Sequence, residues 1–136
     1  MAVAFLTACS SNSATSNGAA SNGTTSNSKS AVCTDVANLK TSVQDLKNIN
    51  VRANGISAIS DELAKIQQQL NTLKTDAKGQ YSTQITALSN ALSGLGTSLD
   101  AAKSDLNAGT LGAVATAAHS VVTAGNNLVT AVSNTC

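Results

Sequence analysis

Apolar residues recur at alternating spacings of three and four along almost the whole chain from Val36 onward. The chain contains no proline, so long uninterrupted helices are permitted. Such spacing gathers apolar side chains on one stripe of a helix, as at the seam of a coiled coil or a four-helix bundle. The four stripes are Val36, Leu39, Val43 and Leu46; Ile56, Ile59, Leu63, Ile66, Leu70 and Leu73; Tyr81, Ile85, Leu88, Leu92, Leu95, Leu99, Ala102 and Leu106; and Leu111, Val114, Ala118, Val121, Gly125, Leu128 and Val132. We therefore expect an all-α fold with helices over about 34–48, 55–77, 82–107 and 110–134.

Turn signals fall between the expected helices. Asn54-Gly55 is a strong turn pair between the first two segments, and Asn107-Ala108-Gly109 ends the third. Thr34 and Thr110 are suited to cap the first and the fourth helix, because their side-chain oxygens accept hydrogen bonds from free backbone N–H groups.

The boundary between the second and third segments has two readings. Lys78-Gly79-Gln80 either forms a helix end and a loop, with Ser82 as the next N-cap, or lies inside one long helix. The second reading is open because Leu73, Ala77, Tyr81 and Ile85 continue at spacings of four.

The segment Leu6-Thr7-Ala8-Cys9 resembles the lipobox of bacterial lipoproteins. In that family, signal peptidase II cuts before the cysteine, and the cysteine thiol carries a diacylglycerol. The resemblance implies lipid attachment at Cys9, with residues 1–8 as the remnant of a signal peptide. No Lys or Arg occurs before Lys29, whereas a signal peptide opens on a basic segment, which a start codon further upstream would supply.

The stretch Ser10–Ser30 is low in complexity and contains no Val, Ile, Leu or aromatic residue. Without apolar side chains to bury, this segment cannot offset the conformational entropy that it would lose on folding. We therefore expect residues 9–31 to form a flexible tether. The root-mean-square end-to-end distance of this stretch would be roughly 25 Å. With Cys9 acylated, the tether would hold a domain of residues 32–136 off the membrane.

Cys33 and Cys136 remain once Cys9 is assigned to lipid, and they stand at the two ends of the foldable segment. In an exported protein, we expect these two cysteines to form a disulfide. The alternative is two free thiols in a cytosolic protein. One long helix over 55–107 would leave these cysteines roughly 18 Å apart, whereas a disulfide needs Cα atoms within about 7 Å. A hairpin near Gly79 brings both to one end. We therefore predict an antiparallel up-down-up-down four-helix bundle with a disordered N-terminal tether.

The composition argues against several classes of function. Charged residues make up 11% of the chain and the net charge is +1, so no basic surface for nucleic acid is expected. Phe5 and Tyr81 are the only aromatic residues, which removes stacking platforms for bases and sugars. His119 has no ligand-type neighbour, and Asp61 is expected in a helix-surface ion pair with Lys65. We expect no enzymatic activity, catalytic residue, metal or cofactor.

The fourth segment is unusual because no Asp, Glu, Lys or Arg occurs from Leu106 to Cys136. It has three readings: the most buried helix of the bundle, an uncharged face for a protein partner, or a segment in a membrane. His119 and the pair Asn126-Asn127, near its middle, argue against the last.

The start Cys9-Ser10-Ser11-Asn12 followed by heptads is similar to the major murein lipoprotein of Gram-negative outer membranes. That family forms one long trimeric helix ending in a lysine bonded to peptidoglycan, and neither feature carries over to a chain with Gly-rich breaks that ends in Cys136.

The chain more closely resembles small exported proteins of actinobacteria, which have a lipobox or signal peptide, a Ser/Thr/Gly tether, a Cys-x(5)-Leu-Lys-x-Ser-Val-x-x-Leu start and a final cysteine. Here that start reads CTDVANLKTSVQDL over 33–46. This resemblance implies an envelope location and a helical fold, and no activity.

We therefore expect an extracytoplasmic protein, anchored to the bacterial cell membrane by lipid on Cys9. It would act as a non-catalytic structural or protein-interaction module, with any protein partner on the fourth helix. The alternative is an envelope carrier of a small apolar ligand held within the bundle. A coiled coil that self-assembles is a third hypothesis, although we expect a monomer.

Overall fold

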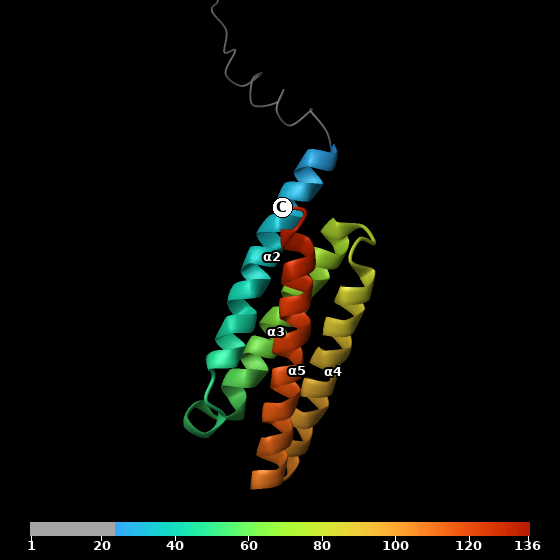
Figure 1. The fold of residues 1–136 in the computed structure, drawn as a ribbon. Coiled ribbons are helices and arrows are strands. Elements are labelled where there is room, and N and C mark those ends of the chain that lie inside the picture. The colour runs from blue at the N-terminus through green and yellow to red at the C-terminus, as the bar shows by residue number, and fades with distance from the viewer. Residues whose placement is uncertain (1–23) are drawn as a thin grey trace, which may run out of the picture.

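The computed structural model describes residues 24–136, except for the side chains of residues 24–28 and 51–53. This part of the chain forms four helices and no strand: α2 (Thr24–Asn48), α3 (Val51–Ala77), α4 (Ser82–Ser104) and α5 (Ala108–Ser133). Each helix packs against the next, and α5 returns to pack against α2 (Figure 1). The predicted four-helix bundle is confirmed.

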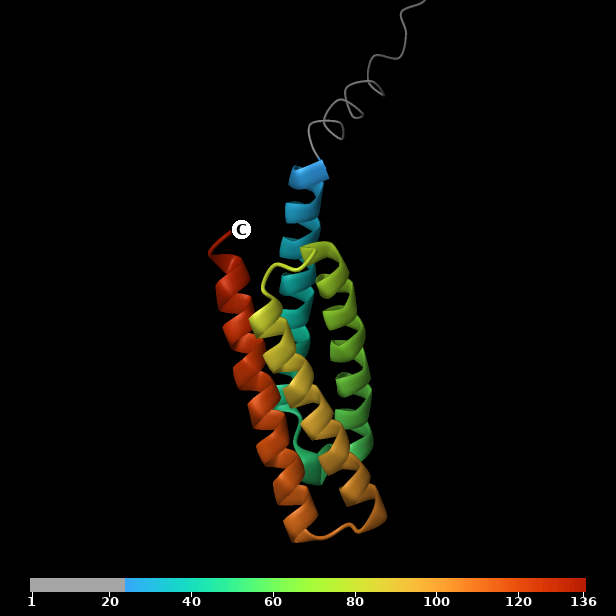
Figure 2. The same ribbon diagram turned by 90° about the vertical axis from the view of Figure 1, so that its right-hand side faces the viewer.

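α2 begins well before the predicted start at Thr34. Thr34 lies inside the helix, where its hydroxyl donates to the Ser30 carbonyl oxygen at 3.0 Å, so Thr34 is not the N-cap. Val32 is only 6% exposed, so the apolar stripe starts one turn before Val36. With no proline to interrupt the backbone hydrogen bonds, α2 takes in residues 24–31, which the sequence assigns to the tether, and projects past the other helices (Figure 2). The rest of the predicted tether lies outside the described residues.

The connection between α3 and α4 is a hairpin. α3 ends at Ala77 and α4 begins at Ser82, which rules out one long central helix. The chain reverses through left-handed backbone at Lys78 (φ 49°), Gly79 (φ 89°) and Tyr81 (φ 59°). Tyr81 is the N-cap residue of α4 and makes no side-chain capping hydrogen bond, so the predicted capping by Ser82 is wrong.

The other two connections use turn chemistry at the expected places. Gly55 kinks α3 with φ 77° and ψ 177°, a region open essentially to glycine alone. Asn107 caps α5: its Oδ1 accepts from the Thr110 N–H at 2.9 Å, and the Thr110 hydroxyl accepts from the Asn107 N–H at 3.1 Å. Thr110 therefore completes a capping box instead of being the cap itself.

The apolar stripes meet along the axis of the bundle and form its core. The largest fully buried side chains are Leu39, Ile59, Ile66, Leu73, Leu88, Leu92, Leu95, Leu99 and Leu128. Gly125 is buried where α5 meets α2, and a Cβ atom there would lie 2.7 Å from Val43 Cγ2, so this contact requires glycine. Leu106 departs from the expected pattern: it is 66% exposed, because α4 ends at Ser104.

Candidate functional site

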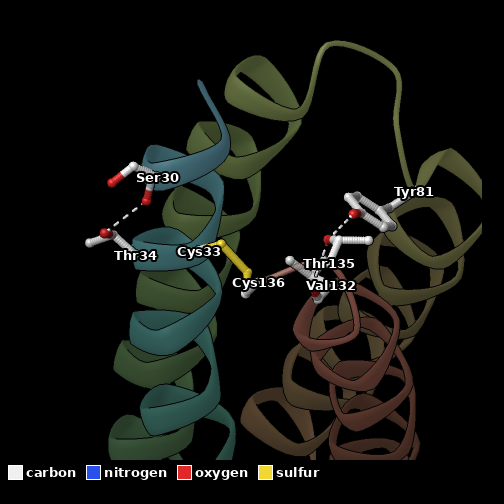
Figure 3. The surroundings of a disulfide bond; sticks show 7 residues. All are labelled: Ser30, Cys33, Thr34, Tyr81, Val132, Thr135 and Cys136. Atoms are coloured by element: carbon white, nitrogen blue, oxygen red, sulfur yellow. Dashed lines mark hydrogen bonds between the residues drawn. A yellow bond between two sulfur atoms is a disulfide. The ribbon is translucent and has the colours of Figure 1, made fainter. Parts of the chain in front are cut away.

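Cys33 and Cys136 close one end of the bundle. Their sulfur atoms are 2.05 Å apart and their Cα atoms 5.9 Å apart, so a disulfide joins α2 to the residues that follow α5 (Figure 3). Beside it, the Tyr81 and Thr135 hydroxyls are hydrogen-bonded, and Thr135 Oγ1 donates to the Val132 carbonyl oxygen at 2.8 Å. This end therefore connects α2, the start of α4 and the end of α5.

Cys9 lies outside the described residues, so lipid attachment there stays a prediction. α2 runs past Cys33 to Thr24. The described chain thus begins at the disulfide end of the bundle (Figure 2).

Asp35 on α2 and Asp76 on α3 form a carboxyl pair. Burial raises the pKa of Asp35 from 3.8 to about 6, with further contributions from its hydrogen bond to Asp76 and from the negative charge of Asp76. The Oδ2 atom of Asp35 is buried and has no hydrogen-bond partner. A partly buried carboxyl beside a second carboxylate keeps its proton to a higher pH than a free carboxyl does, so Asp35 favours its protonated form. The sequence gives no local signal for this pair, because it depends on the register of two antiparallel helices.

The remaining titratable candidates lie on the surface. His119 is exposed on α5. Lys65 Nζ lies 3.4 Å from Glu62 Oε1 and 3.9 Å from Asp45 Oδ2, so these carboxylates, and not Asp61, are its partners. Residues 24–136 contain no group of three or more His, Cys, Asp or Glu side chains able to hold a metal ion.

α4 and α5 share a surface without formal charge. No Asp, Glu, Lys or Arg occurs from Tyr81 to Leu99 or from Leu106 to Cys136, and the two helices pack side by side. We call their exposed side the uncharged surface; it includes Thr83, Thr86, Ser89, Asn90, Ser93, Gly94 and Thr97 of α4, and Ala113, Thr116, His119, Ser120, Thr123, Asn126, Asn127 and Thr130 of α5. The sequence predicts this surface only on the fourth helix, and packing extends it onto α4.

α5 has one buried side and one exposed side. It buries Val114, Val121, Leu128 and Val132 on one side and exposes the uncharged surface on the other. None of the helices within residues 24–136 combines the length and hydropathy needed to cross a bilayer.

Hydroxyl groups of the uncharged surface bond to the backbone of their own helices. On α5, Thr116 and Thr123 donate to carbonyl oxygens four residues earlier, at 3.0 Å each. On α4, Ser93 and Thr97 do the same, at 3.1 Å each. Because these donors are already satisfied, covering the surface with a partner costs less desolvation than the composition suggests.

An open hollow of about 1130 Å³ lies at the end of the bundle opposite the disulfide. We call it the end hollow; it is lined by Lys47, Asn48, Ile49, Asn50, Gly55, Ile56, Leu106, Asn107, Ala108, Leu111, Gly112 and Ala115. These residues come from the end of α2, the α2–α3 connection, the first turns of α3, the α4–α5 connection and the first turns of α5. A smaller hollow of about 260 Å³ lies beside the α3–α4 hairpin.

Comparison of the chain with protein-family models, with curated proteins and with solved structures finds no match.

Proposed function

We propose that this protein is a lipid-anchored protein of the bacterial cell envelope that works by contact with another protein. In this proposal Cys9 carries the lipid, residues 10–23 link the anchor to α2, and the disulfide-closed bundle presents the uncharged surface. The role is structural or protein-interacting and not catalytic.

The uncharged surface is the observation that carries the proposal. Exposed helix positions ordinarily hold Lys and Glu, which favour both solubility and helix formation. Here the exposed positions of α4 and α5 hold Ser, Thr, Asn, Ala and Gly across most of both helices. Most of these residues form helices less readily than Lys or Glu. The centre of a protein–protein interface is depleted of charged residues, and of Ser and Ala as well. The lack of charge on α4 and α5, and not their Ser and Ala content, therefore supports a contact surface.

Photo-crosslinking in the producing cells tests the contact. A photoreactive residue would replace Asn90 on α4 or Thr123 on α5, and the matched control would replace Gln67, which is exposed on α3. We expect the same crosslinked protein from Asn90 and Thr123 and none from Gln67. Equal capture from all three positions, or capture from none, would contradict the proposed surface.

The anchor needs a separate test. The full gene, with any upstream start restored, would be expressed in a host that processes lipoproteins, and the intact mass measured. We expect a chain that begins at Cys9 and carries a diacylglycerol, and a Cys9→Ser variant that leaves the membrane fraction. A chain that keeps Met1 and carries no lipid would refute the anchor but not the contact surface.

A carrier that holds an apolar ligand within the bundle is less favoured. Ile66, Leu73 and Leu88 each have 0% exposure, so large side chains already fill the space between helices. Native mass spectrometry on protein extracted gently from its own envelope would detect such a ligand.

A further inference from the structure

We infer that the α3–α4 hairpin is a hinge at which two copies of this chain exchange halves once the Cys33–Cys136 disulfide is open. In the resulting dimer, residues 77–82 continue α3 into α4 as one helix. The α2–α3 half of each copy then packs against the α4–α5 half of the other. The partner is a second copy of the chain, and the inference depends on neither the lipid anchor nor the uncharged surface.

The hairpin has backbone strain that a continuous helix would remove. Lys78 (φ 49°) and Tyr81 (φ 59°) are left-handed although neither is glycine, and a Cβ atom disfavours this conformation. Tyr81 precedes α4 without a side-chain capping hydrogen bond. The connection consists of residues 78–81 alone. Short connections under strain favour domain swapping, in which two copies exchange an identical element.

The sequence across the hairpin is compatible with a helix. It contains no proline, and apolar residues at spacings of four span it: Leu73, Ala77, Tyr81 and Ile85. On one continuous helix these side chains would share a side, and that side would face the core of both bundles. The last carbonyl groups of α3 and the first N–H groups of α4 lack helical partners in the hairpin. In a continuous helix they would bond to one another.

The exchange keeps the four main helix contacts of the bundle. The α2–α3 and α4–α5 contacts remain within each chain, and the α2–α5 and α3–α4 contacts are remade between the two copies by the same side chains. The α3–α4 contact, which the opening hinge breaks, is the least extensive of the four. A second copy therefore matches each half of the chain as well as the chain's own other half does.

The disulfide opposes the exchange because it ties α2 to the residues that follow α5 of the same chain. It lies at the same end of the bundle as Tyr81 and the hairpin (Figure 3). A dithiol opens the bridge by thiol–disulfide exchange: Cys33 and Cys136 each gain a hydrogen, and the dithiol becomes a cyclic disulfide. Lys29 and Ser30 are exposed where α2 projects past this end (Figure 2), so the projecting part can turn aside as the halves separate.

Pulsed electron paramagnetic resonance on the full chain in dithiothreitol tests the hinge. Spin-labelled non-natural residues would replace Gln67 on α3 and Asn90 on α4, both exposed. Dilution with unlabelled chains restricts the measurement to distances within one chain. We expect a distance of about 35 Å, the rise of one helix from residue 67 to residue 90, in a fraction that grows with protein concentration. In the hairpin the axes of neighbouring helices are only about 10 Å apart. Light scattering should give twice the mass of one chain, and the oxidised chain should form less dimer.

Matched variants test the strain, with dimerisation of the reduced chain measured by sedimentation. Gly79→Ala should raise the association constant at least about tenfold, because alanine favours the helix and disfavours the φ of 89° that Gly79 has in the hairpin. Lys78→Gly should lower it by a similar factor, since glycine accepts left-handed backbone and weakens a helix. Gly94→Ala is the control, because Gly94 lies inside α4 in both assemblies.

Three results would overturn the inference. A dimer in which the distance from residue 67 to residue 90 stays short would consist of two closed bundles packed side by side. A reduced chain that stays monomeric at its highest soluble concentration, with Gly79→Ala equally monomeric, would show that no halves are exchanged. Equal association constants for Gly79→Ala and Lys78→Gly would show that the hairpin is not the hinge.

Discussion

Gly125 is the residue at which the packing of α5 on α2 is most sensitive to a single methyl group. We expect the new Cβ of Gly125→Ala to cost about 1–3 kcal/mol in overpacking, because it would lie 2.7 Å from Val43 Cγ2. Alanine normally gains about 1 kcal/mol in a helix interior, so the variant should be less stable by up to about 2 kcal/mol. Guanidinium unfolding monitored by circular dichroism measures the difference.

Gly94→Ala is the matched control for Gly125→Ala. Gly94 lies inside α4 with nothing within 4 Å of its Cβ position, so alanine there should stabilise the protein by about 0.5–1 kcal/mol. Adding Val43→Ala to Gly125→Ala should recover part of the loss, as expected when two residues share one contact. Equal effects of Gly125→Ala and Gly94→Ala would refute the close approach.

The Asp35–Asp76 pair makes stability depend on pH. Because the folded-state pKa of Asp35 is raised from 3.8 to about 6, the folded protein binds this proton more tightly than the unfolded chain does. The stabilisation that this bound proton gives to the folded state is fully present below about pH 4 and is lost as the pH rises through 6. Asp35→Asn cannot ionise and still donates a hydrogen bond, so it should stabilise the protein at pH 7.5 by about 1 kcal/mol and change little at pH 4. This gain in stability is smaller than the pKa shift alone would give, because water screens the partly exposed Asp35 side chain.

Asp61→Asn removes the same charge from an exposed position on α3 and serves as the control. Urea unfolding at pH 4, 6 and 7.5 should show a stability gain that grows with pH for Asp35→Asn and not for Asp61→Asn. Parallel pH profiles for the two variants would argue against a raised pKa at Asp35.

At the scale of the single helix, the start of α5 depends on its capping box. Asn107→Ala removes the oxygen that accepts from the Thr110 N–H at 2.9 Å, and we expect a loss of about 1 kcal/mol. Asn127→Ala, at an exposed position inside α5, should be neutral or slightly stabilising, since alanine is the better helix former. Thermal unfolding of the two variants separates them, and a common effect would count against the cap.

Helix positions are predictable from this sequence because the apolar spacing is regular and proline is absent. The predicted end of the second helix at residue 77 and the start of the third at 82 agree with α3 and α4. Capping residues are less predictable: Tyr81, not Ser82, precedes α4, and Thr34 lies within α2. A cap depends on the path by which the chain enters the helix, and that path is set by packing at the end of the bundle as well as by residue type.

At the scale of the whole molecule, the candidate sites differ in how far the sequence reveals them. The lack of charge on α5 is visible in the sequence. Its extension onto α4 requires knowing that these helices are neighbours with outward-facing sides. The end hollow requires more, because it arises from the unequal reach of two connections and from the exposure of Leu106, a residue that the apolar spacing assigns to the core.

The disulfide joins α2 to the residues that follow α5, so its contribution belongs to the whole molecule. It spans 103 residues, and a closed loop of that length restricts the unfolded chain more than the folded one. We expect the double variant Cys33→Ser and Cys136→Ser to lose about 2–4 kcal/mol of unfolding free energy. The variant should remain helical, because the side chains that fill the core do not depend on the bridge. Guanidinium unfolding with and without reductant measures this loss.

Cys9→Ser is the control for the disulfide variant, and reductant should lower its unfolding midpoint as much as that of the unmodified chain. The double variant should not respond to reductant at all. A midpoint that reductant leaves unchanged in the unmodified chain would mean that Cys33 and Cys136 are free thiols in the protein as isolated. The hairpin at Gly79 and the packing of the core would then have to hold α2 and the end of α5 together without a covalent bond.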